Sequence, residues 1–271
     1  MTNQSNEPYT FYQEKKPRMT YKKRIITAGI VLAVIGGVTM GMICHAHHTA
    51  QAANYYQAQD VKVKHKIATG AQRQKVLATQ YSGNTAISSS AQIKQYRQLP
   101  GQLYLVGYIA IPVQDGVKNP VITMQINEGA TNKVLAYGAG TVKSGQNMGE
   151  ANFSLAAHNY GDNKTGFSPL QSSIDVDKHP KAYLSDGNKI YIYQFNSKNE
   201  SVSGNTVVNY KNTSVASDKR VTNKPLLTLV TCDEPGWFNL HPENRKVLTA
   251  HLLSETSVSD ASKTNQQLFT N

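Results

Sequence analysis

Apolar and polar positions divide the chain into parts with different periodicities. The first part is a run from Ile25 to Cys44 that carries no charged side chain. An α-helix of this length rises about 30 Å, which matches the hydrocarbon core of a bilayer. The pattern therefore predicts one transmembrane helix over residues 25–44.

Short apolar runs dominate the chain from residue 99 to about residue 253, and Gly, Asn, Asp and Pro separate them. Several runs are enriched in Val, Ile, Tyr and Thr, which favour β-strands. The residues Asp186-Gly187-Asn188 form a turn that leads into an alternating strand. We expect strands at Leu103–Pro112, Val121–Ile126, Lys133–Tyr137, Ala151–Ala157, Lys189–Phe195, Thr206–Tyr210, Leu226–Thr231 and Lys246–Leu253. Eight short strands predict an all-β fold, a closed or nearly closed β-barrel.

The formal net charge of +11 is unevenly distributed along the chain. Residues 1–24 hold six basic and two acidic side chains, residues 45–98 hold seven and one, and the remainder from residue 99 holds 15 and 14. Short basic flanks stay in the cytoplasm, so we expect a cytoplasmic N-terminus and an exported remainder. The excess of basic side chains lies in the segments that flank the apolar span, where they would meet anionic lipid headgroups or cell-wall polymers. The nearly neutral folded part argues against nucleic-acid binding.

A cleaved signal peptide is the alternative to an anchor, since Ala50, Ala52 and Ala53 could form a cleavage site. The apolar run is longer than the roughly 7–15-residue core of a signal peptide. We therefore favour an uncleaved anchor, and either reading places the folded part outside the cytoplasm.

The segment from residue 45 to 98 is rich in Gln, Ala, Lys and Ser and has few large apolar side chains. Such a sequence buries too little surface to offset its chain entropy. We expect an extracellular stalk that is helical around residues 58–78. The predicted organisation is a cytoplasmic tail 1–24, a transmembrane signal anchor 25–44, the stalk 45–98, a folded domain 99–255 and a polar C-terminal tail 256–271.

Cysteine usage supplies the candidate chemistry. Of the two cysteines, Cys44 closes the apolar span and Cys232 ends a strand-like run, so the two sulfurs are not expected to pair. A cysteine reacts as its thiolate, and a neighbouring histidine raises the ionised fraction. His158 ends a strand-like run before a turn, which suits a cleft. His241 in a loop and His251 in the last run are the weaker candidates.

The folded domain holds two arginines, Arg220 and Arg245. Arg245 follows Cys232 by 13 residues, a spacing at which a hairpin would bring a second strand beside the cysteine strand. A guanidinium there could stabilise the oxyanion formed when a thiolate attacks a carbonyl. The alternative is a surface arginine at the start of a strand.

The only tryptophan, Trp237, lies in the loop between Cys232 and Arg245. It could cover the edge of the barrel, or it could form a wall of a pocket for an apolar part of a substrate. His45, His47 and His48 cluster beside the apolar span, but no scaffold fixes their geometry for a metal.

Four segments resemble a known family in order along the chain. Thr228-Leu229-Val230-Thr231-Cys232 resembles the TLxTC signature of sortases, the exported cysteine transpeptidases of Gram-positive cell walls. Gly107–Pro112 is similar to the family's opening GxIxIP strand, Leu155–Asn159 to its histidine strand and Asn244–Leu248 to its arginine strand. The matches cover nearly all of residues 103–252.

The resemblance implies a sortase-like eight-stranded β-barrel with short helices. It implies that Cys232 is the nucleophile, His158 the general acid and base, and Arg245 the group that holds the substrate carbonyl and stabilises the tetrahedral intermediate. The implied substrates are surface proteins with an LPxTG-type sorting signal, cut between Thr and Gly. The implied acceptor is an amine of the peptidoglycan precursor lipid II. We expect Ala157, Thr231 and Trp237 to bind substrate.

Amide exchange needs no ATP, and we expect no cofactor. The N-terminal anchor and the lack of a second apolar span or of a lid segment resemble class A, the housekeeping sortases. Some class A members bind calcium through carboxylates. Here the corresponding region supplies only Asp115 and Glu128, too few for a site, and we expect no metal.

Two other classes remain as alternatives. One is an exported cysteine hydrolase or another wall-remodelling enzyme. An L,D-transpeptidase would carry a His-Gly-Cys type segment, and a papain-like peptidase would place its cysteine before its histidine; neither pattern occurs. The other is a membrane-tethered β-barrel module without catalysis, in which Cys232 is a small buried apolar residue.

Overall fold

The computed structural model describes residues 21–62, 66–74, 89–143, 145–203, 207, 224–233 and 243–270. The chain divides into two compact units, Met1–Ile43 and Cys44–Asn271. The helices are α1 Tyr21–Lys62, α2 Gly70–Arg73, α3 Ser90–Arg97, α4 Asn132–Leu135 and α6 Lys263–Gln267, with 3₁₀ helices η2 Ser168–Leu170 and η3 Val176–Lys178. The strands are β1 Leu105–Ile111, β2 Val121–Asn127, β3 Gly138–Thr141, β4 Asn152–Ala156, β5 Lys181–Ser185, β6 Lys189–Ser203, β7 Leu226–Cys232 and β8 Asn244–Ser257.

Helix α1 contains the predicted apolar span. Among the described residues, one helix is long and apolar enough to cross a membrane by length and composition, the Ile26–Lys62 part of α1. Its most apolar window has a mean hydropathy of 2.2. This helix is a possible membrane anchor.

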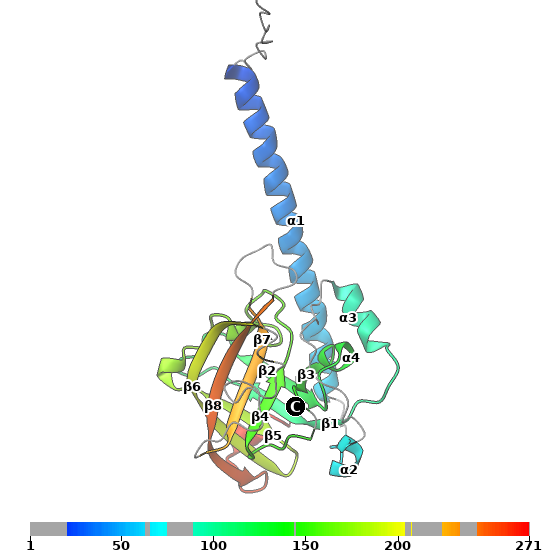
Figure 1. The fold of residues 1–271 in the computed structure, drawn as a ribbon, viewed down its shortest axis with the longest axis vertical. Helices are drawn as coiled ribbons and strands as arrows, with labels where there is room; N and C mark the ends of the chain where they lie inside the picture. Colours follow the sequence, from blue (N-terminus) through cyan, green and yellow to red (C-terminus); the bar gives the residue numbers. More distant parts are fainter. Residues whose placement is uncertain are drawn as a thin grey trace, which may run out of the picture. The chain divides into compact units, whose positions relative to one another are not determined.

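The eight strands close into a barrel in the order β1-β2-β3-β4-β7-β8-β6-β5. Strands β4, β7, β8 and β6 are neighbours on one side of this barrel (Figure 1). The pairs β2–β3 and β4–β7 are parallel, and the other neighbours are antiparallel. Large side chains fill the interior, among them the fully buried Phe153, Phe167, Tyr193 and Phe195. The predicted all-β barrel is confirmed.

One predicted strand is wrong, because residues 132–135 form helix α4. The side chain of Thr131 accepts a hydrogen bond from the backbone N–H of Val134 and caps this helix. Such an N-cap stabilises a helix by about 1 kcal/mol, and the short apolar run itself has no decisive period. The predicted strand at residues 206–210 lies outside the described residues except for Val207.

Two strands were not predicted, β3 and β5. Strand β3 has the sequence Gly-Ala-Gly-Thr, which lacks the bulky residues that indicate strands. Gly140 is required there, because a Cβ atom would lie 2.2 Å from the carbonyl oxygen of Gly129. Strand β5 pairs with β6 through Ser185 and Ile190, so the predicted turn at residues 186–188 is confirmed and joins the unpredicted β5 to β6.

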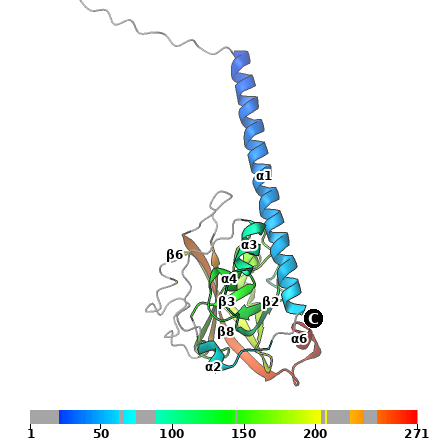
Figure 2. The same ribbon diagram turned by 90° about the vertical axis from the view of Figure 1, so that its right-hand side faces the viewer.

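The segments on either side of the barrel are packed against it. Five residues of α1 beyond the apolar span are buried: Thr49, Ala50, Ala53, Gln57 and Asp60. Helix α6 lies near the C-terminal end of the chain (Figure 2). Just after it, the carbonyl of Leu268 accepts a hydrogen bond of 2.7 Å from the hydroxyl of Thr123. Composition predicted a stalk over residues 45–98 and a polar tail over residues 256–271, and it does not reveal which helix face meets a neighbour.

Candidate active site

The predicted pairing of Cys232 with Arg245 is present in the sheet. Strands β7 and β8 are antiparallel, and these two residues are direct cross-strand partners. Residues in such positions project from the same face of the sheet, with Cβ atoms about 4.5–5.5 Å apart. The hydrogen bond of 3.0 Å from the backbone N–H of Asp233 to the carbonyl of Asn244 extends the pairing one step further. The two side chains therefore leave the sheet side by side on one face, and Nη1 of Arg245 donates a 2.8 Å hydrogen bond to the carbonyl of Asn244.

His158 reaches the same end of the sheet from β4. Strand β4 runs parallel to β7, with Ala156 opposite Val230, and the N–H of Ala157 donates to the carbonyl of Val230 over 3.2 Å. Two residues beyond this pair, the two strands lead to His158 and Cys232. The ends of β4 and β7 thus carry the imidazole and the thiol at the same level.

These residues lie on the outer face of the barrel wall. Leu229 and its partner Leu248 belong to the interior core, whereas Val230 and its partner Val247 belong to a separate buried cluster. Side chains alternate between faces along a strand, so Cys232 projects on the side of Val230. This second cluster also contains Ala130, Leu135, Val142, Ala156 and Val207. A buried apolar cluster therefore lies beneath the end of the sheet that carries the thiol.

Burial controls the protonation of His158. The residue is 3% exposed, and burial lowers the pKa of its imidazole from 6.5 to about 3. Its Nε2 atom has no hydrogen-bond partner among the residues that the structure describes. The imidazole is therefore neutral at physiological pH.

Two side-chain amides fix the backbone at the cysteine. The carbonyl of Cys232 accepts 3.0 Å and 2.6 Å hydrogen bonds from Nδ2 of Asn159 and Nε2 of Gln171. The carbonyl of Gln171 in turn accepts from Nζ of Lys198 over 2.9 Å. Asn159 could have been suspected as the neighbour of His158, but nothing in the sequence pointed to Gln171.

The other predicted site residues lie as follows. Ala157 belongs to the interior core, and the buried hydroxyl of Thr231 donates to the carbonyl of Ala157 over 2.9 Å. These two residues tie β4 to β7, and their contact with substrate stays a prediction. Trp237 and His241 lie outside the described residues.

His251 is placed away from the thiol. It pairs with Leu226 at the start of β7, whereas Cys232 ends the same strand. Six residues of strand separate these positions by about 20 Å. The structure therefore groups His158, and not His251, with Cys232. The two cysteines, both among the described residues, are not joined by a disulfide.

The carboxylate of Glu128 is engaged within the chain. Its side chain is fully buried and accepts hydrogen bonds from Nε of Arg73 at 2.5 Å, the hydroxyl of Thr141 at 3.1 Å and the N–H of Gly145 at 2.7 Å. Arg73 thus supplies a positive charge to this carboxylate. Asp115, the other acidic residue considered for calcium, is exposed. The expectation of no metal stays a prediction.

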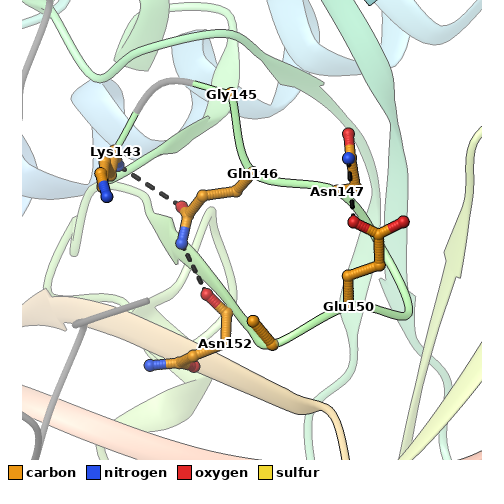
Figure 3. Close-up of a pocket in the computed structure, with 7 residues that line it drawn as sticks. Lys143, Gly145, Gln146, Asn147, Glu150 and Asn152 are labelled. Atoms are coloured by element: carbon orange, nitrogen blue, oxygen red, sulfur yellow. Dashed lines mark hydrogen bonds between the residues drawn. The ribbon is translucent and has the colours of Figure 1, made fainter. Parts of the chain in front are cut away.

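A separate polar pocket of about 230 Å³ lies at the other end of β4. It is lined by Lys143, Gly145, Gln146, Asn147, Glu150, Ala151 and Asn152 (Figure 3). Asn152 begins β4, whereas His158 follows the end of that strand. This pocket is therefore distinct from the thiol site.

A thiol, a buried imidazole and a guanidinium at one end of a closed barrel are the parts of a cysteine enzyme. A family model described as the Sortase domain matches residues 109–253. Sortase A of Streptococcus agalactiae serotype III (strain NEM316) is 30% identical over 217 residues, covering 78% of this chain and 76% of that protein. Sortase A of Bacillus anthracis is 26% identical over 213 residues, covering 78% and 88%.

Among solved structures, Listeria monocytogenes sortase A has a TM-score of 0.46 at 23% identity, covering 61% of this chain and 96% of that one. Sortase C-3 from Streptococcus pneumoniae has a TM-score of 0.45 at 17% identity, covering 85% and 93%. The family model and the 30% identical relative decide the assignment. The chain belongs to the sortase family and is a cysteine transpeptidase of cell-wall sorting. The curated relatives' shared name, Sortase A, supports class A.

Proposed function

We propose that this sortase cleaves an LPxTG-type sorting signal between Thr and Gly and transfers the surface protein to an amine of the peptidoglycan precursor lipid II. In this proposal Cys232 is the nucleophile, His158 the general acid and base, and Arg245 the oxyanion-stabilising group. The observation that carries it is the cross-strand pair of Cys232 and Arg245, with His158 arriving at the same level from β4.

The first half-reaction forms a thioester. The neutral imidazole of His158 accepts the thiol proton as the sulfur attacks the carbonyl carbon of the signal's Thr, because with a pKa of about 3 it is too weak a base to ionise the thiol beforehand. The tetrahedral oxyanion lies against the guanidinium of Arg245. Collapse of this intermediate breaks the Thr–Gly bond, and the imidazolium returns its proton to the departing glycine amine. Burial makes the imidazolium a strong acid, because the charged ring is poorly solvated.

The second half-reaction exchanges the thioester for an amide. The acceptor amine attacks the thioester carbonyl, His158 removes the amine proton, and Cys232 leaves as thiolate. The Leu-Pro part of the signal requires an apolar contact near the thiol. Trp237 is a candidate for this contact.

The proposed topology follows the charge distribution. Residues 1–24 form a cytoplasmic tail, the apolar part of α1 spans the membrane, and the catalytic domain lies outside. Proteolysis of intact protoplasts should remove the barrel and leave the N-terminal tail protected. Protection of the barrel would contradict this orientation.

A peptide library tests the reaction. The full chain in detergent micelles is incubated with fluorogenic LPxTG peptides and an amine acceptor, and products are identified by mass spectrometry. We expect a product cut after Thr and joined to the amine, and no thioacyl adduct with Cys232→Ala. His158→Ala should lose about 10²–10⁴-fold in rate, whereas His251→Ala, at the distant end of β7, should stay active. Turnover by Cys232→Ala above about one thousandth of wild type would refute the nucleophile assignment.

A further inference from the structure

The ring of Tyr160 packs edge-on against His158. The two ring centroids are 5.9 Å apart, and the planes meet at 66°. Tyr160 is 7% exposed, and its hydroxyl, like Nε2 of His158, has no hydrogen-bond partner among the described residues. Burial raises the pKa of Tyr160 above its usual value, so the phenol is neutral. This contact is therefore one of ring packing, which depends on the position of the tyrosine ring.

The loop that carries both rings is held in one conformation. The N–H of Tyr160 donates to the hydroxyl of Ser168 over 2.7 Å, and the N–H of Phe167 donates to the carbonyl of His158 over 2.9 Å. Gly166 has a φ of +58°, and a Cβ atom there would lie 2.7 Å from the His158 carbonyl oxygen. The backbone thus places the tyrosine ring against the imidazole with little freedom.

The continuation of α1 beyond its apolar span packs around the tyrosine. Ala50 and Ala53 of this helix form one buried cluster with Tyr160, Ile93 and Ala136. Both alanines are 2% exposed. Small side chains at these positions allow the helix backbone to approach closely, and a longer side chain would displace its neighbours.

An ion pair fixes this part of α1 in place. The carboxylate of Asp60 accepts two 2.7 Å hydrogen bonds from the guanidinium of Arg97 on α3. Cζ of Arg97 lies 3.7 Å from the ring centroid of Tyr137 and 4.7 Å from that of Tyr56. A bidentate pair with two stacked rings is geometrically specific, so the helix has one docked position.

We propose that Tyr160 is a positioning residue for His158 and that the Ala50–Ala53 face of α1 holds the tyrosine ring in place. The inference rests on the catalytic role proposed for His158. Its consequence is that the helix containing the apolar span also supplies part of the support of the active site. An imidazole displaced by about 1 Å can lose about 100-fold in rate, so the expected effect is on turnover and not on substrate affinity.

Two substitutions at Tyr160 test the contact in the full chain in detergent micelles. Tyr160→Phe keeps the ring and should retain at least half of the wild-type kcat. Tyr160→Leu removes the ring and should lower kcat about 10- to 100-fold with KM changed less than about threefold. The alkylation rate of Cys232 by iodoacetamide should change little. Equal losses in both variants would show that the hydroxyl is required, and would overturn a role for ring packing.

A matched pair on α1 tests the support. Ala53→Leu enlarges the buried face, whereas Ala58→Leu makes the same change at an exposed position of the same helix. Ala53→Leu should lower kcat in the same way as Tyr160→Leu, and Ala58→Leu should match the wild type. This pair keeps the proposal testable if Tyr160→Leu does not fold. A folded Ala53→Leu protein with wild-type kcat would overturn the role of the helix face.

The outcomes separate this inference from the proposed function. A normal rate in His158→Ala would refute the catalytic assignment itself, whatever the Tyr160 variants do. An inactive His158→Ala beside a folded Tyr160→Leu protein with wild-type kcat would overturn only the positioning role. Circular dichroism and a thermal melt for each variant establish that the folded protein is being measured.

Discussion

The buried imidazole of His158 should make the protein sensitive to acid in a defined pH window. Its pKa is lowered from 6.5 to about 3 by burial, so the folded state keeps it neutral. Above pH 6.5 neither state binds the proton, and the contribution to stability is complete. Between pH 6.5 and 3 only the unfolded state binds it, so the free energy of unfolding decreases as the pH falls.

The magnitude follows from the two pKa values. Each pH unit between them changes the free energy of unfolding by about 1.4 kcal/mol. Unfolded and folded pKa values of 6.5 and about 3 give a loss of about 2 kcal/mol between pH 7 and pH 5. Other titrating groups add their own dependence, so the quantity of interest is the difference between wild type and a variant without this imidazole.

Urea unfolding at pH 7, 6 and 5, followed by far-ultraviolet circular dichroism, measures this difference. We expect His158→Asn to lack about 2 kcal/mol of the acid-induced loss seen in wild type. His179→Asn is the matched control, because His179 is exposed and its φ of 52° suits asparagine. An equal decrease in the free energy of unfolding in wild type and in His158→Asn would refute the reasoning, since the imidazole would then titrate alike in the folded and unfolded states.

Three further substitutions test other parts of the site and its support. Arg245→Lys keeps the charge but loses the planar fork, and should cost about 2–4 kcal/mol in kcat/KM; near-normal peptide turnover would remove the oxyanion role. Gln171→Leu removes the 2.6 Å hydrogen bond to the Cys232 carbonyl and should lower kcat about tenfold; unchanged kinetics would assign that bond a purely structural role. Arg73→Met leaves the buried Glu128 carboxylate without its cation and should lower the free energy of unfolding, measured in urea, by about 2–3 kcal/mol. The double variant with Glu128→Gln should recover part of this loss. No recovery would contradict the argument that the unpaired charge causes the loss.

Two candidate catalytic residues could be predicted from the sequence because their residue types are rare in the folded domain. The folded domain has one cysteine and two arginines, so the choice of Cys232 and Arg245 needed only a hairpin spacing to become specific. The register of β7 and β8 confirms that spacing. The strands that escaped prediction are those whose residues carry no strand signal, such as β3, where glycines are required by the closeness of neighbouring backbone.

The supports of the site could not be predicted, because common residues provide them. Gln171 reaches the Cys232 carbonyl across 61 positions of sequence, and only tertiary structure brings the two together. Ala50 and Ala53 lie in a segment whose composition predicts a solvated stalk. Their burial depends on the position of Arg97 and Tyr160, which no local pattern encodes.

Burial of the imidazole links the chemistry to the packing around it. A low pKa makes the imidazolium a strong proton donor to the leaving amine, and this property requires that water be kept from the ring. Hydrogen bonds to the charged form would raise the pKa and weaken that donor. An aromatic edge, as Tyr160 provides, can orient the ring without stabilising its charge through a hydrogen bond. Support by packing alone is then expected at this position, from Tyr160 and from the helix face proposed to hold its ring.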